Sequence, residues 1–374
     1  MEKIHIIFFG FLENDRKTLS VGGVQTYIYN LCGVIRSIGF DPIVYQPADE
    51  YFETEYQGIK VIGVKGTNNN FSKRAIKKIS KGEIVIFASE EFSCKYEGEI
   101  ITIQHGIYWD RPKHYGWSKQ LNHLFVLWRS LLAYKKVKQI DYARKVICVD
   151  YNFINWYRSQ VAYPNVQLVA IPNFAKPADG LVKDKNSNAV KIIFARRFVE
   201  FRGTRVFQTA ILRLLKEYGS RIDVTFAGSG PDESFLRETF KKYENVHFIR
   251  YKNEESLTIH SEMDIAVIPT VGSEGTSLSL LEAMSSGCAV VCTDVGGMTN
   301  IVLNNYNGLM IPANDANELY NSMKYLIDNK DKRISLAEKA IETTQKVFSY
   351  ERWKNLWERE LLESVKHKME RDQL

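Results

Sequence analysis

The stretch VKIIFARRFVEFRGTRVFQTAILRLLKEYGSRIDVTFAG, residues 190–228, indicates how the chain is built. An apolar run at 190–195 leads through a polar loop into a segment of helical periodicity, and a second apolar run follows at 222–228. Apolar runs that do not alternate with polar residues are typical of parallel strands covered on both faces. The order strand, helix, strand therefore predicts a doubly wound α/β unit.

The same alternation extends through the rest of the chain. Further short runs rich in Val, Ile and Phe occur at 5–10, 83–89, 100–104, 145–149, 166–172, 246–249, 264–269 and 289–294. The segment 175–189 is polar, contains Pro and Gly, and lacks any period, so it predicts a linker. A length of 374 residues also exceeds one ordinary domain.

We therefore expect two Rossmann-like domains and a terminal helix. The expected bounds are 1–175 for an N-terminal domain, 190–345 for a C-terminal domain, and 346–374 for the helical tail. Within the tail, Trp353, Leu356, Trp357, Leu361 and Val365 recur at helical spacing on one face.

Composition indicates a globular protein that does not span a membrane. Hydrophobic residues make up 45% and charged residues 25% of the chain. No apolar run approaches the roughly 18 residues of a spanning helix, and the start MEKIHIIFFGF lacks the features of a signal peptide. The five scattered cysteines are expected to be buried thiols in a reducing compartment, so we expect a cytoplasmic protein.

The net charge of +6 is concentrated in one stretch. Residues 111–145 hold nine Lys or Arg and a single acid, Asp141. Apolar and aromatic residues at helical spacing precede three lysines there: Leu121, Leu124, Phe125, Trp128, Leu131, Leu132 and Tyr134, then Lys135, Lys136 and Lys138. Such a helix can pack its apolar stripe on the N-terminal sheet and leave a solvated basic end. Alternatively, it can lie on an anionic membrane surface.

The segment SEGTSLSLLEAMSSG, residues 273–287, places two carboxylates around the start of a helix. Glu274 lies in the loop and Glu282 lies inside the helix among apolar residues. A buried carboxylate needs partners, and ribose hydroxyls could donate two hydrogen bonds to it. Gly275, Thr276 and Ser277 open the helix, where free N–H groups favour a phosphate. Taken alone, the pair is better explained by Glu274 as a helix cap and Glu282 in an ion pair with a surface arginine.

Two arginines follow the strand at 190–195. Arg197 and Arg202 lie in the loop before the next helix, and Gly203 permits a tight entry into that helix. In an open parallel sheet this loop lies at the carboxyl ends of the strands, where ligands bind. Two guanidinium groups there suit a diphosphate, although two solvated surface arginines would give the same pattern.

Together these motifs resemble the retaining glycosyltransferases of family 4, in glycosyltransferase group 1, which have the GT-B fold. The glutamate pair with seven intervening residues is present as Glu274 and Glu282. The Gly-Arg-Leu-x-x-x-Lys-Gly loop appears as residues 196–203, with Arg196 in place of the usual glycine and Arg202 in place of the usual lysine. The glycine turn after the next strand appears at 227–231, and a Gly-Gly pair appears at 296–297.

The resemblance implies roles for residues in both halves. It implies a fold of two Rossmann-like domains that face each other across a cleft, with the C-terminal helix crossing back to the N-terminal domain. The implied catalytic residues are His105, Glu274, Arg197 and Arg202. The implied donor-binding residues are Gly22, Gly23, Gly228, Arg250, Gly275, Thr276, Ser277, Leu278 and Glu282. Among these, Arg197 and Arg202 would hold the diphosphate, Glu282 the ribose and Glu274 the donor sugar.

The implied reaction is hexose transfer, with retention, from a UDP- or GDP-linked sugar. The acceptor would be a glycan or a lipid-linked molecule, in surface polysaccharide or lipopolysaccharide biosynthesis at the cytoplasmic membrane face. No cofactor and no nucleic-acid partner are expected. No metal is expected either, since the chain has no Asp-x-Asp triplet of the kind that binds a metal ion in the other major glycosyltransferase fold. A nucleotide-sugar epimerase, a phosphorylase and a non-catalytic nucleotide-sugar-binding protein remain alternatives on the same fold. A dinucleotide-dependent oxidoreductase is disfavoured, because no spaced triple-glycine turn follows the first strand.

Overall fold

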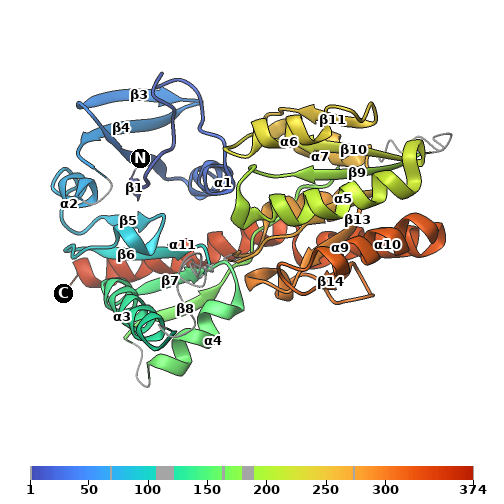
Figure 1. The fold of residues 1–374 in the computed structure, drawn as a ribbon. Coiled ribbons are helices and arrows are strands. Elements are labelled where there is room, and N and C mark those ends of the chain that lie inside the picture. The colour runs from blue at the N-terminus through green and yellow to red at the C-terminus, as the bar shows by residue number, and fades with distance from the viewer. Residues whose placement is uncertain are drawn as a thin grey trace. The chain divides into compact units, whose positions relative to one another are not determined.

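The computed structural model describes residues 2–67, 70–106, 122–161, 165–178, 189–272 and 274–373. Two compact units divide these residues between them (Figure 1). One unit contains the described residues before 173 together with 351–373. The other contains the described residues from 173 to 350.

The first unit is built on an eight-stranded sheet with the order β3-β4-β2-β1-β5-β6-β7-β8. Only β3 and β4 pair antiparallel. The strands are β1 (Lys3–Ile7), β2 (Asp41–Ala48), β3 (Phe52–Tyr56), β4 (Ile59–Lys65), β5 (Ile84–Phe87), β6 (Glu99–Gln104), β7 (Lys145–Cys148) and β8 (Gln167–Ala170). The helices are α1 (Gly23–Ser37), α2 (Phe71–Ile76), α3 (Asn122–Ile140), α4 (Tyr151–Gln160) and α11 (Tyr350–Asp372).

The second unit has a six-stranded parallel sheet with the order β11-β10-β9-β12-β13-β14. Its strands are β9 (Val190–Ala195), β10 (Ile222–Ala227), β11 (Val246–Ile249), β12 (Ile265–Ile268), β13 (Ala289–Thr293) and β14 (Leu309–Ile311). Its helices are α5 (Thr204–Tyr218), α6 (Glu233–Phe240), α7 (Ser256–Ser261), α8 (Leu278–Ser285), α9 (Ala316–Asp328) and α10 (Lys330–Val347).

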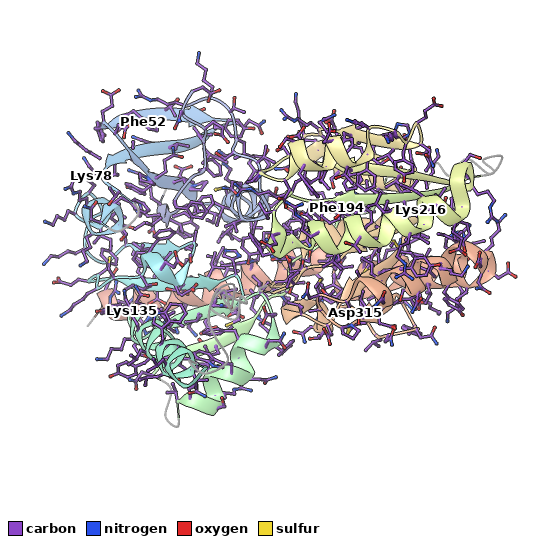
Figure 2. All side chains as sticks on the ribbon, in the orientation of Figure 1. Phe52, Lys78, Lys135, Phe194, Lys216 and Asp315 are labelled. Carbon is purple, nitrogen blue, oxygen red and sulfur yellow. The ribbon has the colours of Figure 1, made fainter. Side chains whose placement is uncertain are left out.

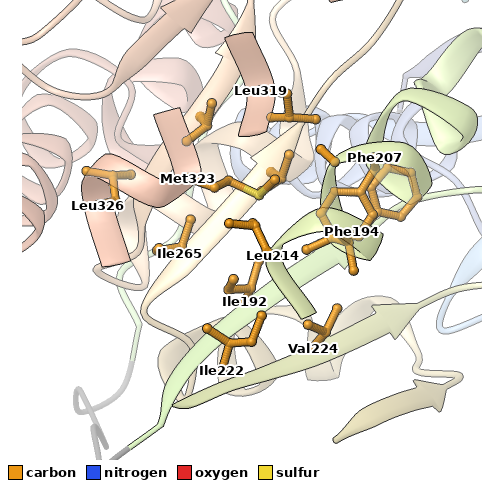
Figure 3. Close-up of a cluster of buried hydrophobic side chains, with 14 of the residues drawn as sticks. Ile192, Phe194, Phe207, Leu214, Ile222, Val224, Ile265, Leu319, Met323 and Leu326 are labelled. Atoms are coloured by element: carbon orange, nitrogen blue, oxygen red, sulfur yellow. The ribbon is translucent and has the colours of Figure 1, made fainter. Parts of the chain in front are cut away.

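Both faces of the second sheet are covered, as the continuous apolar strands predict. Ile192 and Phe194 of β9 pack on one face with Phe207 of α5 and Met323 of α9 (Figure 3). Ile193 packs on the opposite face, in the apolar cluster that includes residues of α8 and α10. Burying one such large apolar side chain contributes about 1.5–3 kcal/mol, so this two-sided core holds the loops at the strand ends in place.

The unit boundary lies earlier than the expected linker. The Ala175 N–H donates to the Phe348 carbonyl (2.8 Å), and the Tyr350 N–H donates to the Ala175 carbonyl (3.2 Å). Ala175 is therefore held in the second unit, and the boundary falls after Pro172 instead of within 175–189. Helix α10 likewise continues to Val347, past the expected end of that domain at 345.

Helix α11 belongs to the first unit, where the red ribbon of Figure 1 lies with the strands of that unit. Trp353, Trp357 and Leu361 are fully buried or nearly so, which agrees with the amphipathic face expected from the sequence. The Trp357 Nε1–H donates to the Tyr27 hydroxyl of α1 at 2.7 Å. The expected return of the terminal helix to the N-terminal domain is thus present in the structure.

Candidate active site

Glycines at the carboxyl ends of β9 and β10 let two loops approach each other closely. Gly203, before α5, has φ +83°, and a Cβ there would lie 1.8 Å from the Pro269 carbonyl oxygen. Gly228, after β10, has φ +140°, and a Cβ there would lie 2.3 Å from the Arg196 carbonyl oxygen. Both positions are restricted to glycine by conformation and by space. The loop that carries residues 196–202 is therefore fixed at the end of the sheet.

Three donors converge on one oxygen of Glu274. Its Oε2 accepts hydrogen bonds from Arg196 Nη2 at 2.7 Å, from Thr270 Oγ1 at 3.0 Å and from Arg202 Nη1. The side chain of Glu274 is 10% exposed, that of Arg196 5% and that of Arg202 26%. A carboxylate and two guanidinium groups are thus brought together at the strand ends.

This arrangement keeps Glu274 ionised. Burial would raise the pKa of its carboxyl. The charges of Arg196 and Arg202, and hydrogen bonds from Arg196 and Thr270, outweigh burial and lower the pKa from 4.5 to about 2. Glu274 therefore offers a permanent negative charge and accepts hydrogen bonds without donating any at neutral pH.

A second pair of glycines holds the backbone around Glu274. A Cβ at Gly296 would lie 2.0 Å from the Glu274 carbonyl oxygen, and one at Gly297 would lie 2.7 Å from the Thr276 nitrogen. The Gly297 N–H donates to the Glu274 carbonyl at 2.8 Å. Asn173 Nδ2 donates to the Thr276 carbonyl. The segment Glu274–Thr276 is therefore clamped from two sides.

Glu282, on α8, lies in a different environment. Ser256 Oγ donates to its Oε2 at 2.7 Å, and no basic side chain contacts it in the described part of the chain. Burial raises the pKa of the Glu282 carboxyl from 4.5 to about 7, with only partial relief from the Ser256 hydrogen bond. Tyr251 lies close enough for the Glu282 charge to raise the pKa of its phenol further. A carboxylate with one described side-chain donor can accept hydrogen bonds from further donors.

Helix α8 begins in the same region. Ser277 is its N-cap residue, but its side chain makes no capping hydrogen bond, and Leu278 is the first helical residue. Gly275, Thr276 and Ser277 lead directly into the helix, as the sequence predicts. Uncapped N–H groups at a helix start attract negative charge, and here they follow Glu274 immediately.

Two of the sequence-predicted arginines do not bind Glu274. Arg197 is exposed, and its side chain forms no hydrogen bond or ion pair with the described residues. Arg250 is paired with Glu233 at 3.0 Å and its side chain is 73% exposed. The guanidinium that joins Arg202 at Glu274 belongs to Arg196, which the sequence analysis noted only as a replacement for glycine. A charged residue at the end of a buried strand was the available signal.

The first unit carries the other predicted residues. Gly22 is the N-cap of α1, and a Cβ there would lie 2.3 Å from Gln25 Oε1. Gln25 Nε2 in turn donates to the Gly10 carbonyl at 3.0 Å, which ties the start of α1 to the loop after β1. Gly23 is the first residue of α1 and is exposed. The glycine pair therefore presents a helix start without a side-chain cap.

His105 follows β6, where the sequence places it. Its ring meets the Tyr27 ring edge-on, with centroids 5.2 Å apart. Its Nε2 is buried and has no hydrogen-bond partner among the described residues. Burial lowers the pKa of His105 from 6.5 to about 4, against the effect of a hydrogen bond with the Ala88 backbone. At neutral pH the ring is uncharged and retains one unused nitrogen.

The chain is similar to known glycosyltransferases in sequence and to HepE in fold. Residues 189–329 match the family model described as glycosyl transferases group 1. An uncharacterised glycosyltransferase of Methanocaldococcus jannaschii is 24% identical over 73% of this chain and 71% of its own length. A putative colanic acid biosynthesis glycosyltransferase of Escherichia coli is 30% identical over 35% of this chain and 34% of its own length. The crystal structure of Anabaena HepE in complex with UDP and glucose has a TM-score of 0.72 at 14% identity, covering 98% of this chain and all of HepE.

The matched segment belongs to the glycosyl transferases of group 1, and the chain has the GT-B fold. The matched segment contains Glu274, Glu282 and all three arginines of the loop after β9. In this glycosyltransferase the described residues contain no group of three or more His, Cys, Asp or Glu side chains arranged to hold a metal ion. No described helix is long and apolar enough to cross a membrane.

Helix α3 of the glycosyltransferase exposes an unusual amount of apolar surface. Leu124, Leu127 and Leu131 are 57%, 57% and 60% exposed, and Tyr134 is 59% exposed. Lys135 extends from the same helix into solvent (Figure 2). Ile140 is the buried end of the helix. These leucines therefore do not form an apolar stripe packed on the sheet, which was one of the two expectations.

Other members of that expectation are not described. Leu121 and the basic residues from 111 to 121 lie outside the described residues, as do the side chains of Phe125 and Lys136. Trp128 is 39% exposed and Leu132 is partly buried.

Proposed function

We propose that the protein transfers a hexose-type sugar, with retention at the anomeric carbon, from a UDP- or GDP-linked donor to a glycan or lipid-linked acceptor. The observation that carries the proposal is the cluster of Glu274, Arg196 and Arg202 at the end of β9, with Glu282 on the adjacent helix. The similarity to a fold that binds UDP and glucose in HepE supports a nucleotide-sugar donor. We also propose that the chain is a member of family 4 of the glycosyltransferases.

In this proposal each charged group meets one part of the donor. Arg202 and Arg197 bind the diphosphate, which the start of α8, at Leu278, also attracts through its N–H groups. Glu282 accepts hydrogen bonds from the ribose hydroxyls, and Glu274 accepts them from the sugar. Gly228 and Arg250 border the nucleotide, and Gly22 and Gly23 present the start of α1 to the diphosphate.

Departure of the nucleoside diphosphate needs stabilisation of developing negative charge. The guanidinium groups of Arg197 and Arg202 and the start of α8 supply this stabilisation, because their positive potential is in place before the reaction. No metal ion is therefore required. His105 is neutral, and its free Nε2 can hydrogen bond with the donor sugar near the reacting carbon. The acceptor hydroxyl then attacks from the side that the leaving group vacates, with a phosphate oxygen taking its proton.

The decisive experiment is a transfer assay in excess EDTA. UDP-glucose, UDP-N-acetylglucosamine and GDP-mannose are offered with candidate glycan and lipid-linked acceptors, and release of nucleoside diphosphate and the anomeric form of the product are recorded. We expect release in EDTA, an α-linked product from an α-linked donor, and at least tenfold slower turnover for Arg202→Ala. Arg205→Ala, three residues further on and paired with Asp232, is the matched control and should retain full turnover.

Other outcomes separate the alternatives. Strict dependence on added Mg²⁺ or Mn²⁺, or an inverted product, would contradict the mechanism. An epimerised nucleotide-sugar with no diphosphate released would identify an epimerase. Tight binding of the intact donor without turnover against any acceptor would identify a binding protein.

We further propose that the acceptor is membrane-associated, as in surface polysaccharide or lipopolysaccharide biosynthesis at the cytoplasmic face. The exposed leucines and Tyr134 of α3, beside Lys135 and Lys138, combine apolar and basic character on one helix. Such a surface suits peripheral binding to anionic lipid. The similarity to a colanic acid biosynthesis glycosyltransferase supports a polysaccharide product.

A further inference from the structure

The two arginines at Glu274 are not equivalent. Arg196 is nearly inaccessible and makes a second contact, from Nη1 to Thr270 Oγ1. Thr270 is itself held, because its carbonyl accepts a hydrogen bond from Thr293 Oγ1 at 2.6 Å. Arg202 is five times more exposed, and among the described residues its side chain hydrogen bonds only to Glu274. One arginine is therefore fixed in the structure and the other is able to leave.

The two oxygens of Glu274 differ as well. Oε2 receives all three described hydrogen bonds, whereas Oε1 receives none from the described residues. A carboxylate fixed through one oxygen presents the other in a defined direction. This is the geometry required of a group that accepts a hydrogen bond from a ligand hydroxyl.

We propose that Arg196 is a positioning residue that holds Glu274 charged and oriented for the donor sugar while Arg202 leaves Glu274 to bind the donor diphosphate. This inference rests on the proposed function, since it assigns the sugar to Glu274. A diphosphate carries more negative charge than one carboxylate and competes effectively for the exposed Arg202. Without Arg196, Glu274 would then be a buried carboxylate with Thr270 as its remaining partner, and it would take up a proton or turn away.

Arg196 is well placed for this role by the strand that precedes it. Its N–H donates to the Ala227 carbonyl at 2.9 Å, which continues the ladder between β9 and β10. The backbone at 196 is also in close contact with Gly228. A glycine at position 196 would leave the backbone path possible but would remove the fixed cation. The chain therefore supplies a counter-ion for Glu274 that does not depend on whether donor is bound.

The test compares Arg196→Met with the native enzyme. Calorimetry with UDP-glucose and UDP, and with GDP-mannose and GDP as a second pair, gives the affinity gained from the sugar. The sugar-dependent gain is the ratio of the affinity for the nucleotide-sugar to the affinity for the nucleoside diphosphate. We expect this ratio to be at least tenfold smaller in Arg196→Met than in the native enzyme. In addition, kcat at saturating donor should fall at least fivefold between pH 8 and pH 6, because Glu274 now protonates in the donor complex. The native enzyme should show no such fall in kcat.

Two further variants separate positioning from folding. Arg196→Lys restores the charge but cannot reach both Thr270 and Glu274, so it should recover the flat pH profile and only part of the sugar-dependent gain. Arg333→Met removes another buried arginine of the same unit, one that donates to the Leu326 carbonyl, and should leave kcat and both affinities unchanged. If Arg196→Met does not fold, Arg196→Lys alone decides. A sugar-dependent gain in Arg196→Lys that equals that of the native enzyme would then overturn the inference.

Failure of the inference is distinct from failure of the proposed function. Native enzyme that binds neither nucleoside diphosphates nor nucleotide-sugars would contradict the function. In that event the effect of Arg196 on Glu274 is measured without a ligand. The pKa of Glu274 is followed in native and variant protein that carry carboxyl-labelled glutamate. A rise of less than one pKa unit in Arg196→Met, or unchanged sugar-dependent affinity and pH profile in an active enzyme, would overturn the inference.

Discussion

At the scale of single residues, the two glutamates of the site are prepared for different ligands. Glu274 is kept ionised by neighbouring arginines, whereas Glu282 is partly buried with a serine as its hydrogen-bond partner. The same side-chain type can therefore serve a sugar and a ribose with different electrostatics. This division can be measured without knowing the acceptor.

Glu282→Ala should weaken binding of the free nucleoside diphosphate, and Glu274→Ala should mainly weaken binding of the intact nucleotide-sugar. A lost hydrogen bond to a charged group costs about 1.5–3 kcal/mol, or about ten- to a hundredfold in affinity. Calorimetry with both ligands on both variants measures the split. Equal losses for both ligands in both variants would show that the roles are not divided.

The raised pKa of Glu282 predicts a cost in stability at alkaline pH. Because its pKa is raised from 4.5 to about 7, the native state binds the proton more tightly than the unfolded chain between these values. The free energy of unfolding therefore falls as the pH rises through this window. At about 1.4 kcal/mol per pKa unit, the loss above pH 7 is on the order of 3 kcal/mol.

Glu282→Gln cannot ionise, so its Tm without ligand should exceed that of the native enzyme at pH 8 and match it at pH 5. Scanning calorimetry at both pH values measures the difference, and Glu262→Gln, an exposed change in the same unit, is the control. The same Tm difference at pH 5 and pH 8 would refute the assignment of a raised pKa.

Residue spacing predicted which loops would hold the site but not which arginine would face Glu274. Neighbouring arginines at 196 and 197 read alike in the sequence, yet one is buried and the other exposed. The choice depends on which side of the sheet the strand presents as it ends, and on the space left by Gly228. Both are properties of the packed unit, so residue type alone could not give them.

At the scale of elements, buried charge holds α11 in the first unit. Lys145 of β7 is fully buried and pairs with Glu360 at 2.6 Å, while Glu363 lies 3.1 Å from the same amine. Removing one member of a buried pair leaves an uncompensated charge, which costs about 3–5 kcal/mol. An exposed pair on the same helix, Lys366 with Glu370, should contribute less than about 1 kcal/mol.

Lys145→Met is therefore expected to lower the free energy of unfolding by about 3–5 kcal/mol, and Lys366→Met by less than about 1 kcal/mol. Adding Glu360→Met to Lys145→Met should recover part of the loss, because it removes a buried carboxylate whose remaining cationic contact on α11 is the exposed Arg359. Urea titrations of the single and double variants give these values. Equal effects at Lys145 and Lys366 would show that the buried pair has no special role.

Strong apolar periodicity made most elements predictable, whereas the strands β2, β3, β4 and β14 were missed. Strand β2 contains Pro42 and Pro47, which disfavour a central strand. In the sheet, Pro42 pairs with β1 at a position before the pairing of β2 with β4 begins. Pro47 pairs with β4 at a position after the pairing of β2 with β1 has ended. Each proline thus has a neighbouring strand on one side only. This tolerance depends on strand offsets that no local pattern reveals.

At the scale of the whole molecule, the exposed α3 surface predicts reversible membrane binding. Liposome co-sedimentation should require anionic lipid and weaken with added salt, since each Lys or Arg near such a surface contributes about 1 kcal/mol. Changing Lys135, Lys136 and Lys138 to Glu should abolish sedimentation. Lys366, Lys368 and Lys354 of α11 changed in the same way provide a charge-matched control. Native protein that stays in the supernatant with anionic vesicles at low salt would indicate a soluble acceptor.

The division of the chain into units has a consequence for its synthesis. The second unit runs from 173 to 350, but the first requires α11, which leaves the ribosome only after the second unit has been made. Synthesis runs from the N-terminus, and domains generally fold as units while the chain emerges. The half of the protein that is made first is therefore the half that is finished last. Until α11 emerges, Lys145 lacks Glu360 and Tyr27 lacks Trp357. The surface of the first unit that α11 covers stays exposed to solvent during that time.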